Sequence, residues 1–384
     1  FGTQMLGDMG AEVIKIEVPG RGDLIRALPP KVEGEGYYTL ALNRNKKSME
    51  LDLGTTSGKE AFYDLVKISD VVFNNFRAGS MERLAADYET LKEYNPKIIC
   101  CSITGYGPTG PYKDRPSLDD VAQGLAGAMS LSGEPDGPPM RPGIPIADIS
   151  AGIFGAMGVI TALYDKEKTG EGRKIEINLL ESTMFLMSNH YQMYFLTGVA
   201  PGRQGSKHPI LPLAGAYQTK NGYLMLGAMW PRIARVINKD WLMDDPRFDT
   251  TEKRFANRKE LEEIIQEGLM EVDTEDWLEL MQVEDMTAAP VNTLDKVVID
   301  PQVKHNKTVI SMDHPVCGQI KAISNPIHLV DCVKGDSEPP PTLGQHTDEV
   351  LKEILGYSDD KIRKIEEEIK EHAEELEKRA SKKI

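Results

Sequence analysis

The sequence has few cysteines and no long hydrophobic run. Its 384 residues include four cysteines, Cys100, Cys101, Cys317 and Cys332, and none of them forms a C-x-x-C pair. This usage argues against a disulfide framework or a zinc site and predicts buried, reduced thiols in a cytoplasmic protein. Because no apolar run reaches the roughly 18 residues that a membrane span needs, we expect no membrane segment.

Histidine and positive charge are also scarce. The seven histidines are scattered without metal-ligand spacing, and none lies between Phe1 and Asn189, so we expect no metal site. Lysine and arginine number 45 against 60 aspartates and glutamates, which gives a formal net charge of −15. Such a chain lacks the basic surface that nucleic-acid binding requires, although a local basic pocket for a small anion is compatible with it.

The composition is that of a folded globular protein, with 40% hydrophobic and 27% charged residues. At about 150 residues per domain, the length predicts two domains, or one large domain with an insertion. The chain opens at Phe1 inside a helix-like segment without a visible signal peptide. We therefore expect a leading segment before the printed sequence.

Strand-like and helix-like segments alternate in the first half of the chain. This alternation predicts an α/β fold with a mostly parallel, doubly wound sheet. The expected strands are residues 12–18, 48–53, 70–73, 97–103 and 174–179, and the expected helices are 56–68, 80–94, 119–131 and 149–164.

The second half begins with a Gly- and Pro-rich segment, 197–211, that predicts a linker. Two short strands, 215–218 and 223–227, flank an Asn-Gly turn and predict a hairpin. An extended region follows at 308–329. The charged segment 358–384 has a helical pattern and is interpreted as a solvated helix.

Gly105, Gly107 and Gly110 match the G-x-G-x-x-G pattern after a predicted strand. A dinucleotide site needs a helix to begin there, and the prolines at 108, 111 and 116 make a helix improbable before Asp119. We therefore expect no NAD site. A loop at the carboxyl end of a parallel strand is still a suitable place for a ligand.

Asp148 precedes an apolar stretch that carries Gly152, Gly155 and Gly158 at a spacing of three. These small residues predict a helix that approaches another backbone closely. Asp148 then has two interpretations that spacing cannot separate. It caps the helix by accepting backbone N–H bonds, or it is an ionised carboxylate that acts as a nucleophile at the helix N-terminus.

Seven motifs follow one another between residues 1 and about 356. They include MLGDMGAEVIKIE at 5–17, GD with Arg26 at 22–26, NRNKKS and LDL at 43–53, NFRAG at 75–79, SITGYGPTGP at 102–111, Asp148 and LGQHT at 343–347. In this order they resemble the family III CoA-transferases, the CaiB/BaiF family, whose members include formyl-CoA transferases and α-methylacyl-CoA racemases.

The resemblance implies an architecture. It predicts a large Rossmann-like CoA-binding domain over 1–196, a linker over 197–211 and a small α+β domain over 212–300. Residues 301–384 would form a return linker and C-terminal helices that pack on the large domain and complete it. Two chains of the family interlock, so the resemblance implies a homodimer, and a heterodimer stays open.

The resemblance also implies a chemistry. Asp148 would attack an acyl-CoA thioester and form a mixed anhydride, and the CoA thiolate would return to give an aspartyl-CoA thioester. An acceptor carboxylate would then reverse these steps, with neither metal nor ATP. Water must be excluded, because hydrolysis of the anhydride wastes the thioester. Carried over by motif position, the CoA contacts are Leu51, Asn75, Phe76, Arg77, Arg83 and Arg115.

Surface salt bridges for these arginines and core packing for Phe76 are the alternatives. Where some members carry a basic residue after the I-K-I-E run, this chain has Val18, so Arg21 or Arg26 would replace it or the contact is absent. The small domain lacks the glycine-rich loop of the formyl-CoA:oxalate members at 222–231, so we do not expect oxalate specificity.

Two rival functions stay open. A 2-methylacyl-CoA racemase is the first, although the stretch Ser117-Leu118-Asp119-Asp120, which corresponds to the G-H-D segment of the racemases, carries no histidine, so the second base is absent. Either aspartate would orient a catalytic group or cap a helix. The second rival is a non-catalytic CoA-binding subunit of a heteromeric transferase.

For two further features, a structural role is the first interpretation. His346 lies in the C-terminal motif and is expected to cap or turn the chain there. The methionines and aromatics of 184–195 predict core or dimer packing, with an acyl pocket as the alternative.

Overall fold

The computed structural model describes residues 1–227, 229–329 and 337–381. By its contacts the chain divides into two units. Unit 1 contains residues 1–126, 143–191 and 305–384, and unit 2 contains 127–142 and 192–304. The segment 127–142, which the sequence assigned to the large domain, therefore has its contacts in unit 2. Helix α10 (Ser188–Thr197) crosses the boundary.

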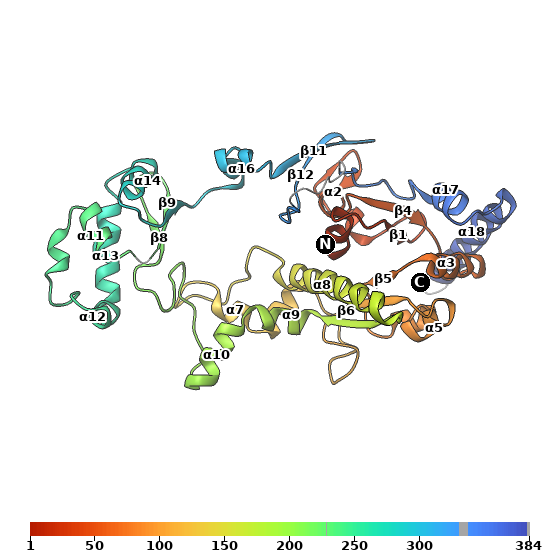
Figure 1. Ribbon diagram of the computed structural model, residues 1–384, viewed down its shortest axis with the longest axis horizontal. Helices are drawn as coiled ribbons and strands as arrows, with labels where there is room; N and C mark the ends of the chain where they lie inside the picture. Colours follow the sequence, from red (N-terminus) through yellow and green to blue (C-terminus); the bar gives the residue numbers. More distant parts are fainter. Residues whose placement is uncertain (228, 330–336, 382–384) are drawn as a thin grey trace. The chain divides into compact units, whose positions relative to one another are not determined.

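Unit 1 is built around parallel strands (Figure 1). One sheet has the order β5-β6-β7, and a second pairs β1 with β4; all these pairs are parallel. Two antiparallel hairpins, β2–β3 and β11–β12, complete the strands. The bounds are β1 (Val13–Glu17), β2 (Lys31–Val32), β3 (Glu35–Gly36), β4 (Lys46–Glu50), β5 (Val71–Asn74), β6 (Ile99–Thr104), β7 (Lys174–Asn178), β11 (Val309–His314) and β12 (Gly318–Ile323).

Helices of unit 1 pack against these strands, so the predicted α/β class is confirmed. The predicted Rossmann-like topology stays a prediction. The helices are α1 (Gly2–Asp8), η1 (Leu24–Ala27), α2 (Tyr37–Leu42), α3 (Thr56–Ile68), α4 (Ser80–Leu84), α5 (Tyr88–Tyr94), α6 (Asp119–Leu125), α8 (Ile146–Thr169), α9 (Leu179–Leu186), α17 (Thr347–Glu349), η3 (Val350–Ile354) and α18 (Asp359–Ser381).

The two helices predicted over 80–94 and 119–131 are each broken in the structure. Ala85 has φ 53° after α4, and the Asp87 side chain caps the new helix α5. Gly127 has φ 81° and separates α6 from α7 (Ala128–Leu131), which belongs to unit 2. Left-handed backbone at one residue ends a helix, and side-chain spacing does not reveal it.

The glycines of α8 let the helix lie close to its neighbours, as their spacing predicted. A methyl group added at Gly152 would lie 3.1 Å from the Gly2 nitrogen of α1. At Gly155 it would lie 2.8 Å from Cζ of Phe73 in β5 and 3.3 Å from Cδ1 of Ile103 in β6. Figure 1 shows α8 alongside β6.

α8 is long and apolar enough to cross a membrane by length and composition, so the expectation of no such stretch is wrong. In the structure, 44% of its most apolar 18-residue window is buried inside the chain. Ala147 and Ala151 pack with Ile103 and Leu179 in a core cluster. A buried core helix of this kind passes the same composition test as a membrane span.

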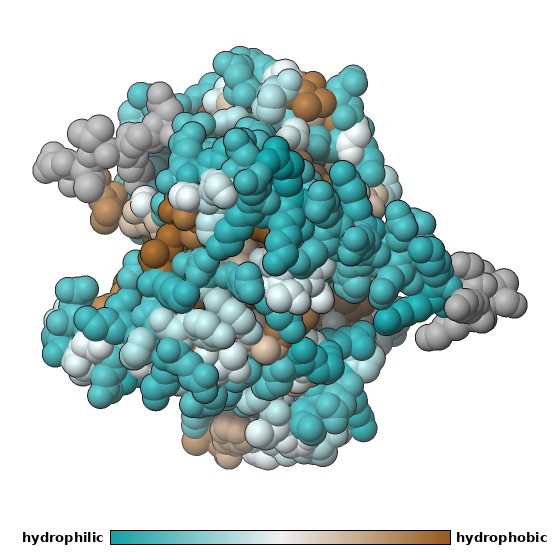
Figure 2. All heavy atoms as spheres, turned by 90° about the vertical axis from the view of Figure 1, so that its right-hand side faces the viewer, coloured by the Kyte–Doolittle hydropathy of each residue, from teal (hydrophilic) through white to brown (hydrophobic). Residues whose placement is uncertain are grey.

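The C-terminal helix α18 is amphipathic and packs on unit 1 with one side, so the interpretation as a solvated helix fits its outward side only. Ile362 and Ile365 are buried against α3 and β4. The Glu368 carboxylate accepts hydrogen bonds from the Ser57 N–H at 2.8 Å and the Ser57 hydroxyl at 2.7 Å, at the start of α3. The outward side is charged, and the face of unit 1 around α18 is mostly hydrophilic (Figure 2).

Unit 2 has its own core around an antiparallel sheet of order β10-β9-β8. The predicted hairpin at Asn221-Gly222 is confirmed, with Gln218 opposite Tyr223. The elements are β8 (Gly215–Gln218), β9 (Tyr223–Leu226), α11 (Arg232–Val236), η2 (Asp240–Met243), α12 (Thr251–Ala256), α13 (Arg258–Leu269), α14 (Thr274–Val283), β10 (Ala288–Pro290), α15 (Leu294–Val297) and α16 (Pro301–His305).

The predicted linker 197–211 is irregular and packs within unit 2. The Arg203 guanidinium donates to the Gly137 carbonyl at 2.6 Å, and the Gly205 N–H donates to the Gly133 carbonyl at 2.9 Å. The linker and the segment 127–142 therefore hold each other in place.

Cys100 and Cys101 are buried free thiols, as expected, and burial raises the pKa of each to about 12. Cys317 is also free but only half-buried, contrary to the prediction. Cys332 lies outside the described residues. Within the described part of the chain, no three His, Cys, Asp or Glu side chains form a group that could hold a metal ion.

Candidate active site

The packing of α8 places Asp148 at the carboxyl edge of the parallel sheet. Gly155 faces Phe73 and Ile103 near the ends of β5 and β6, whereas Gly158 faces Ile175 near the start of β7. The helix therefore runs antiparallel to the strands, and its first turn, with Asp148, lies at their carboxyl ends. This edge is where ligands bind in open α/β sheets.

Asp148 does not cap its own helix; Asp119 does. The Oδ1 atom of Asp119, in α6, accepts the backbone N–H of Ala147 at 2.9 Å and of Asp148 at 3.2 Å. Pro145 occupies the N-cap position, and Asp148 lies in the first turn. Among the described residues, the Asp148 carboxylate has no hydrogen-bond or ion-pair partner. The capping interpretation of Asp148 is therefore wrong, and its carboxylate is left over for another role.

The electrostatic surroundings make this carboxylate more basic than usual. Desolvation, followed by the like charge of Asp119, raises the pKa of Asp148 to about 6, with a smaller contribution from Asp120. Although solvent reaches the Asp148 side chain in the single chain, the protein around it removes part of its hydration. At neutral pH it is ionised, as a nucleophile must be.

Asn75, Phe76 and Arg77 lie in the loop that leaves β5 at the same edge of the sheet. All three side chains are exposed, and Phe76 is 52% exposed, so core packing does not explain it. The Asn74 amide holds the end of β5 to the end of β6 by donating to the Ser102 hydroxyl at 2.8 Å. The Arg77 guanidinium has no hydrogen-bond or ion-pair partner among the described residues, so the salt-bridge alternative fails for it.

Arg83 and Arg115 are exposed cations with local partners. Arg83 donates to the Ser80 hydroxyl at 2.8 Å within α4. Arg115 stacks on Tyr112, with its guanidinium carbon 3.8 Å from the ring centroid. Neither has an ion-pair partner within the described residues, so both keep charge for an anionic ligand.

Leu51 differs from the other predicted CoA contacts because its side chain is 2% exposed and belongs to the core cluster with Met49 and Leu65. Its backbone N–H donates to the Glu17 carbonyl at 3.0 Å. A side-chain contact with CoA therefore does not fit the structure.

Arg26 is unsuited to replace the missing basic residue at Val18. It is 8% exposed and donates twice to the Glu17 carboxylate, each time at 2.7 Å, and to the Pro341 carbonyl. Breaking such a buried pair is strongly destabilising. Arg21 is exposed, and Val18 is 47% exposed, so Arg21 is the remaining candidate for this contact.

The loop after β6 contains no helix directly after the glycine pattern, where a dinucleotide site needs one. Within the described residues 105–118 the chain forms turns, and α6 begins at Asp119. A methyl group at Gly105 would lie 2.4 Å from Cβ of Ser117, so this glycine serves the close return of its own loop.

The C-terminal motif is structural. The Ser48 N–H donates to Nδ1 of His346 at 3.1 Å, and the Glu50 N–H donates to the Thr347 hydroxyl at 3.0 Å. The Gly344 N–H donates to the Ser48 hydroxyl at 2.9 Å. These bonds join the returning segment to the outer edge of β4, in agreement with the expected turn role of His346.

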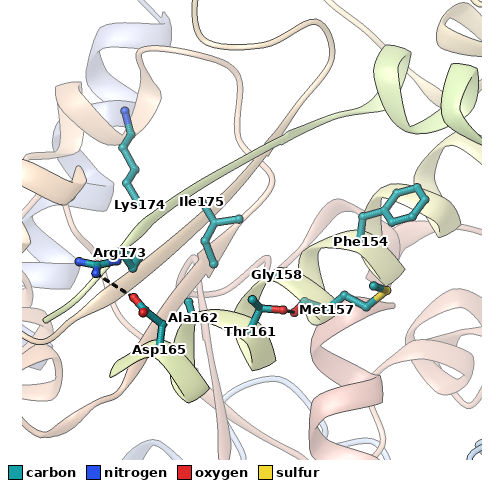
Figure 3. A pocket seen from close by; sticks show the side chains of 9 residues that line it. All are labelled: Phe154, Met157, Gly158, Thr161, Ala162, Asp165, Arg173, Lys174 and Ile175. Carbon is teal, nitrogen blue, oxygen red and sulfur yellow. Dashed lines mark hydrogen bonds and ion pairs between the residues drawn. The ribbon is translucent and has the colours of Figure 1, made fainter. Parts of the chain in front are cut away.

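A shallow groove of about 570 Å³ lies on the outer side of α8 and β7 (Figure 3). Its cations are already paired, Arg173 with Asp165 at 2.8 Å and Lys174 with Glu176 at 2.5 Å. It contains none of the predicted site residues. The groove is lined by Phe154, Met157, Gly158, Thr161, Ala162, Asp165, Arg173, Lys174 and Ile175.

Comparison with known proteins places the chain in a family. Residues 1–347 match the model of CoA-transferase family III. The chain belongs to this family. A crystal structure of a CaiB/BaiF family protein from Brucella suis is similar, with a TM-score of 0.84 and 32% identity, covering 92% of this chain and 94% of that one.

Two named relatives act on succinyl-CoA. The succinyl-CoA:glutarate CoA-transferase of Homo sapiens is 36% identical over 364 residues, or 94% of this chain and 83% of the relative. The succinyl-CoA:mesaconate CoA-transferase of Haloarcula hispanica is 35% identical over 365 residues, or 91% of each. The predicted family and the general activity, CoA transfer with acyl-CoA as co-substrate, are thus confirmed.

The contact of Asp119 with Asp148 is only partly predicted by the sequence. The sequence offered Asp119 and Asp120 equally as caps or orienting groups, without saying which helix they would serve. Gln123, four residues after Asp119, is the signal that distinguishes them, because residues four apart share a helix face. Its amide donates to Oδ2 of Asp119 at 2.5 Å.

Proposed function

We propose that this protein transfers CoA from an acyl-CoA to a small carboxylic acid, through an aspartyl-CoA thioester on Asp148. The observation that carries the proposal is the Asp148 carboxylate, which has no partner among the described residues and lies at the carboxyl edge of a parallel sheet, while another residue, Asp119, caps the helix. A carboxylate with no structural partner is available to attack a thioester.

The steps follow from carboxylate chemistry. Asp148 attacks the donor carbonyl and expels the CoA thiolate, leaving a mixed anhydride. The thiolate attacks the Asp148 carbonyl, which gives the aspartyl-CoA thioester and releases the donor acid. The acceptor carboxylate attacks this thioester, forming a second anhydride and CoA thiolate. Attack of the thiolate on the acceptor's acyl carbon yields the new acyl-CoA and frees Asp148.

The CoA phosphates need cations that are not already neutralised. Arg77, Arg83 and Arg115 meet this need, because each is exposed and lacks an ion-pair partner among the described residues. Asn75 and Phe76 lie beside Arg77 in the loop after β5. We propose these five as CoA contacts and leave Leu51 out, since its side chain is buried.

For the acid pair we propose dicarboxylic acids, with succinyl-CoA as donor. Both named relatives transfer CoA from succinyl-CoA, to glutarate and to mesaconate. A dicarboxylate offers one carboxylate to the reaction and a second for recognition. This second carboxylate distinguishes dicarboxylic acids from formate or a fatty acid as substrates.

We further propose a homodimer. In unit 1, Met157, Ile160 and Phe185 of α8 and α9 are exposed in the single chain. In unit 2, Phe195 and Leu196 of α10 are exposed as well. Core packing therefore does not explain the apolar residues of 184–195. Burial against a second chain would explain them. Sedimentation should then give twice the chain mass of 42.6 kDa.

The activity test is a transfer assay with succinyl-CoA and a panel of acids, including glutarate, mesaconate, oxalate and acetate. Glutaryl-CoA or mesaconyl-CoA should form with release of succinate, and Asp148→Asn should abolish it. A racemase would instead exchange the α-proton of a 2-methylacyl-CoA with solvent without moving CoA. A non-catalytic subunit would bind CoA and do neither.

A further inference from the structure

Asp119 is tied to the candidate nucleophile by geometry that ordinary helix capping does not require. Its side chain is buried, with the whole residue 7% exposed. Oδ1 accepts the N–H of Ala147 and the N–H of Asp148 itself, from a position 29 residues earlier in the chain. Oδ2 accepts the amide of Gln123, which is fully buried. The Asp119 carboxylate is thus fixed on both oxygens.

This arrangement has two physical effects on Asp148. The two N–H bonds fix the backbone of the first turn, from which the Asp148 side chain projects. They also occupy donors at a helix N-terminus that would otherwise stabilise the Asp148 anion. The negative charge of Asp119 repels that anion further. A carboxylate deprived of such stabilisation is a stronger base and a stronger nucleophile.

We propose that Asp119 is a positioning residue for Asp148, which holds the first turn of α8 in place and whose charge keeps the Asp148 carboxylate reactive. The inference rests on the proposed function of Asp148 as nucleophile. Asp120, on the same helix as Asp119, is a further charged group that faces Asp148. Asp120 raises the pKa of Asp148 less than Asp119 does.

Three substitutions separate position from charge. Asp119→Asn keeps an oxygen that can accept the two N–H bonds and removes the charge. Asp119→Ala removes both. Asp114→Asn removes the same charge from an exposed loop site and serves as the matched control. Thermal unfolding of each variant first shows that it is folded.

The readout is the rate of CoA-adduct formation on Asp148 from succinyl-CoA, measured by quenched intact-protein mass between pH 4.5 and 8.5. Asp119→Asn should shift the acid limb of the rate profile down by about one pH unit. Asp119→Ala should also lower the plateau rate by about tenfold to a hundredfold, because the first turn is misplaced. Asp114→Asn should leave both unchanged.

If the acid limb of the rate profile lies at the same pH in Asp119→Asn as in wild type, the inference is overturned. If wild-type protein forms no adduct, the proposed function fails instead, and a second measurement still tests the coupling. The stability gained by Asp148→Asn at pH 8, relative to pH 4, should be smaller in the Asp119→Asn background than in wild type. An equal gain in both backgrounds would show that the two carboxylates are not coupled.

Discussion

At the residue scale, Asp148 is held in an environment that disfavours its own charge. Its pKa of about 6 lies above the ordinary value of 3.8 because of desolvation and Asp119. Between these values the folded chain keeps a proton that the unfolded chain has released. The contribution of this group to stability is therefore fully present below about pH 4 and is lost as the pH rises through 6.

Asp148→Asn should then stabilise the protein at pH 8 relative to wild type, and the difference should disappear towards pH 4. Urea unfolding at several pH values measures it. A variant that is less stable than wild type at pH 8 would show that the Asp148 carboxylate is stabilised by its neighbours, against the electrostatic picture above.

Leu51 and Arg77 should respond differently to replacement by alanine. Leu51→Ala should lower the free energy of unfolding by about 2–5 kcal/mol, because it opens a cavity in a buried cluster. Arg77→Ala should leave stability within about 0.5 kcal/mol of wild type, as surface changes usually do, and raise KM for the acyl-CoA. An unchanged KM in Arg77→Ala would remove it from the CoA site.

Residue patterns predicted the parts of the site that depend on local sequence. Asp148 at the start of a glycine-rich helix, the loop 75–79 after β5 and the turn role of His346 follow from motifs within a few residues. The role of Asp119 depends on a contact across 29 residues, and the burial of Arg26 depends on Pro341. Contacts of this length arise from tertiary packing, which spacing does not record.

At the element scale, the position of α8 against the sheet decides where Asp148 lies. Gly155→Ala places a methyl group 2.8 Å from Phe73 Cζ, so the helix or the ring must move. Overpacking of this kind costs about 1–3 kcal/mol. We expect a matching loss of stability and a slower adduct formation on Asp148, measured by urea unfolding and by intact mass.

Gly143→Ala is the matched control for that prediction. Gly143 lies in the loop just before α8, and an added methyl group there meets nothing within 4 Å. This variant should keep wild-type stability and rate. Equal losses in both variants would mean that the loop, rather than the helix contact, controls the position of Asp148.

At the scale of the whole molecule, the α/β class and the hairpin of unit 2 follow from periodicity and turn residues. The outline of the two units does not, because unit 1 is assembled from three separate stretches of chain. The return of 305–384 is fixed by particular bonds, such as those of Thr347 to β4 and Glu368 to α3. Charge pattern alone could not separate such a packed helix from a solvated one.

The most direct test of the account is the mass of the intact protein after incubation with succinyl-CoA, with and without hydroxylamine, for wild type and Asp148→Asn. Wild type should gain the mass of one CoA and lose it with hydroxylamine, and the variant should gain nothing. An adduct of equal size on Asp148→Asn, or none on wild-type protein that binds CoA, would contradict it.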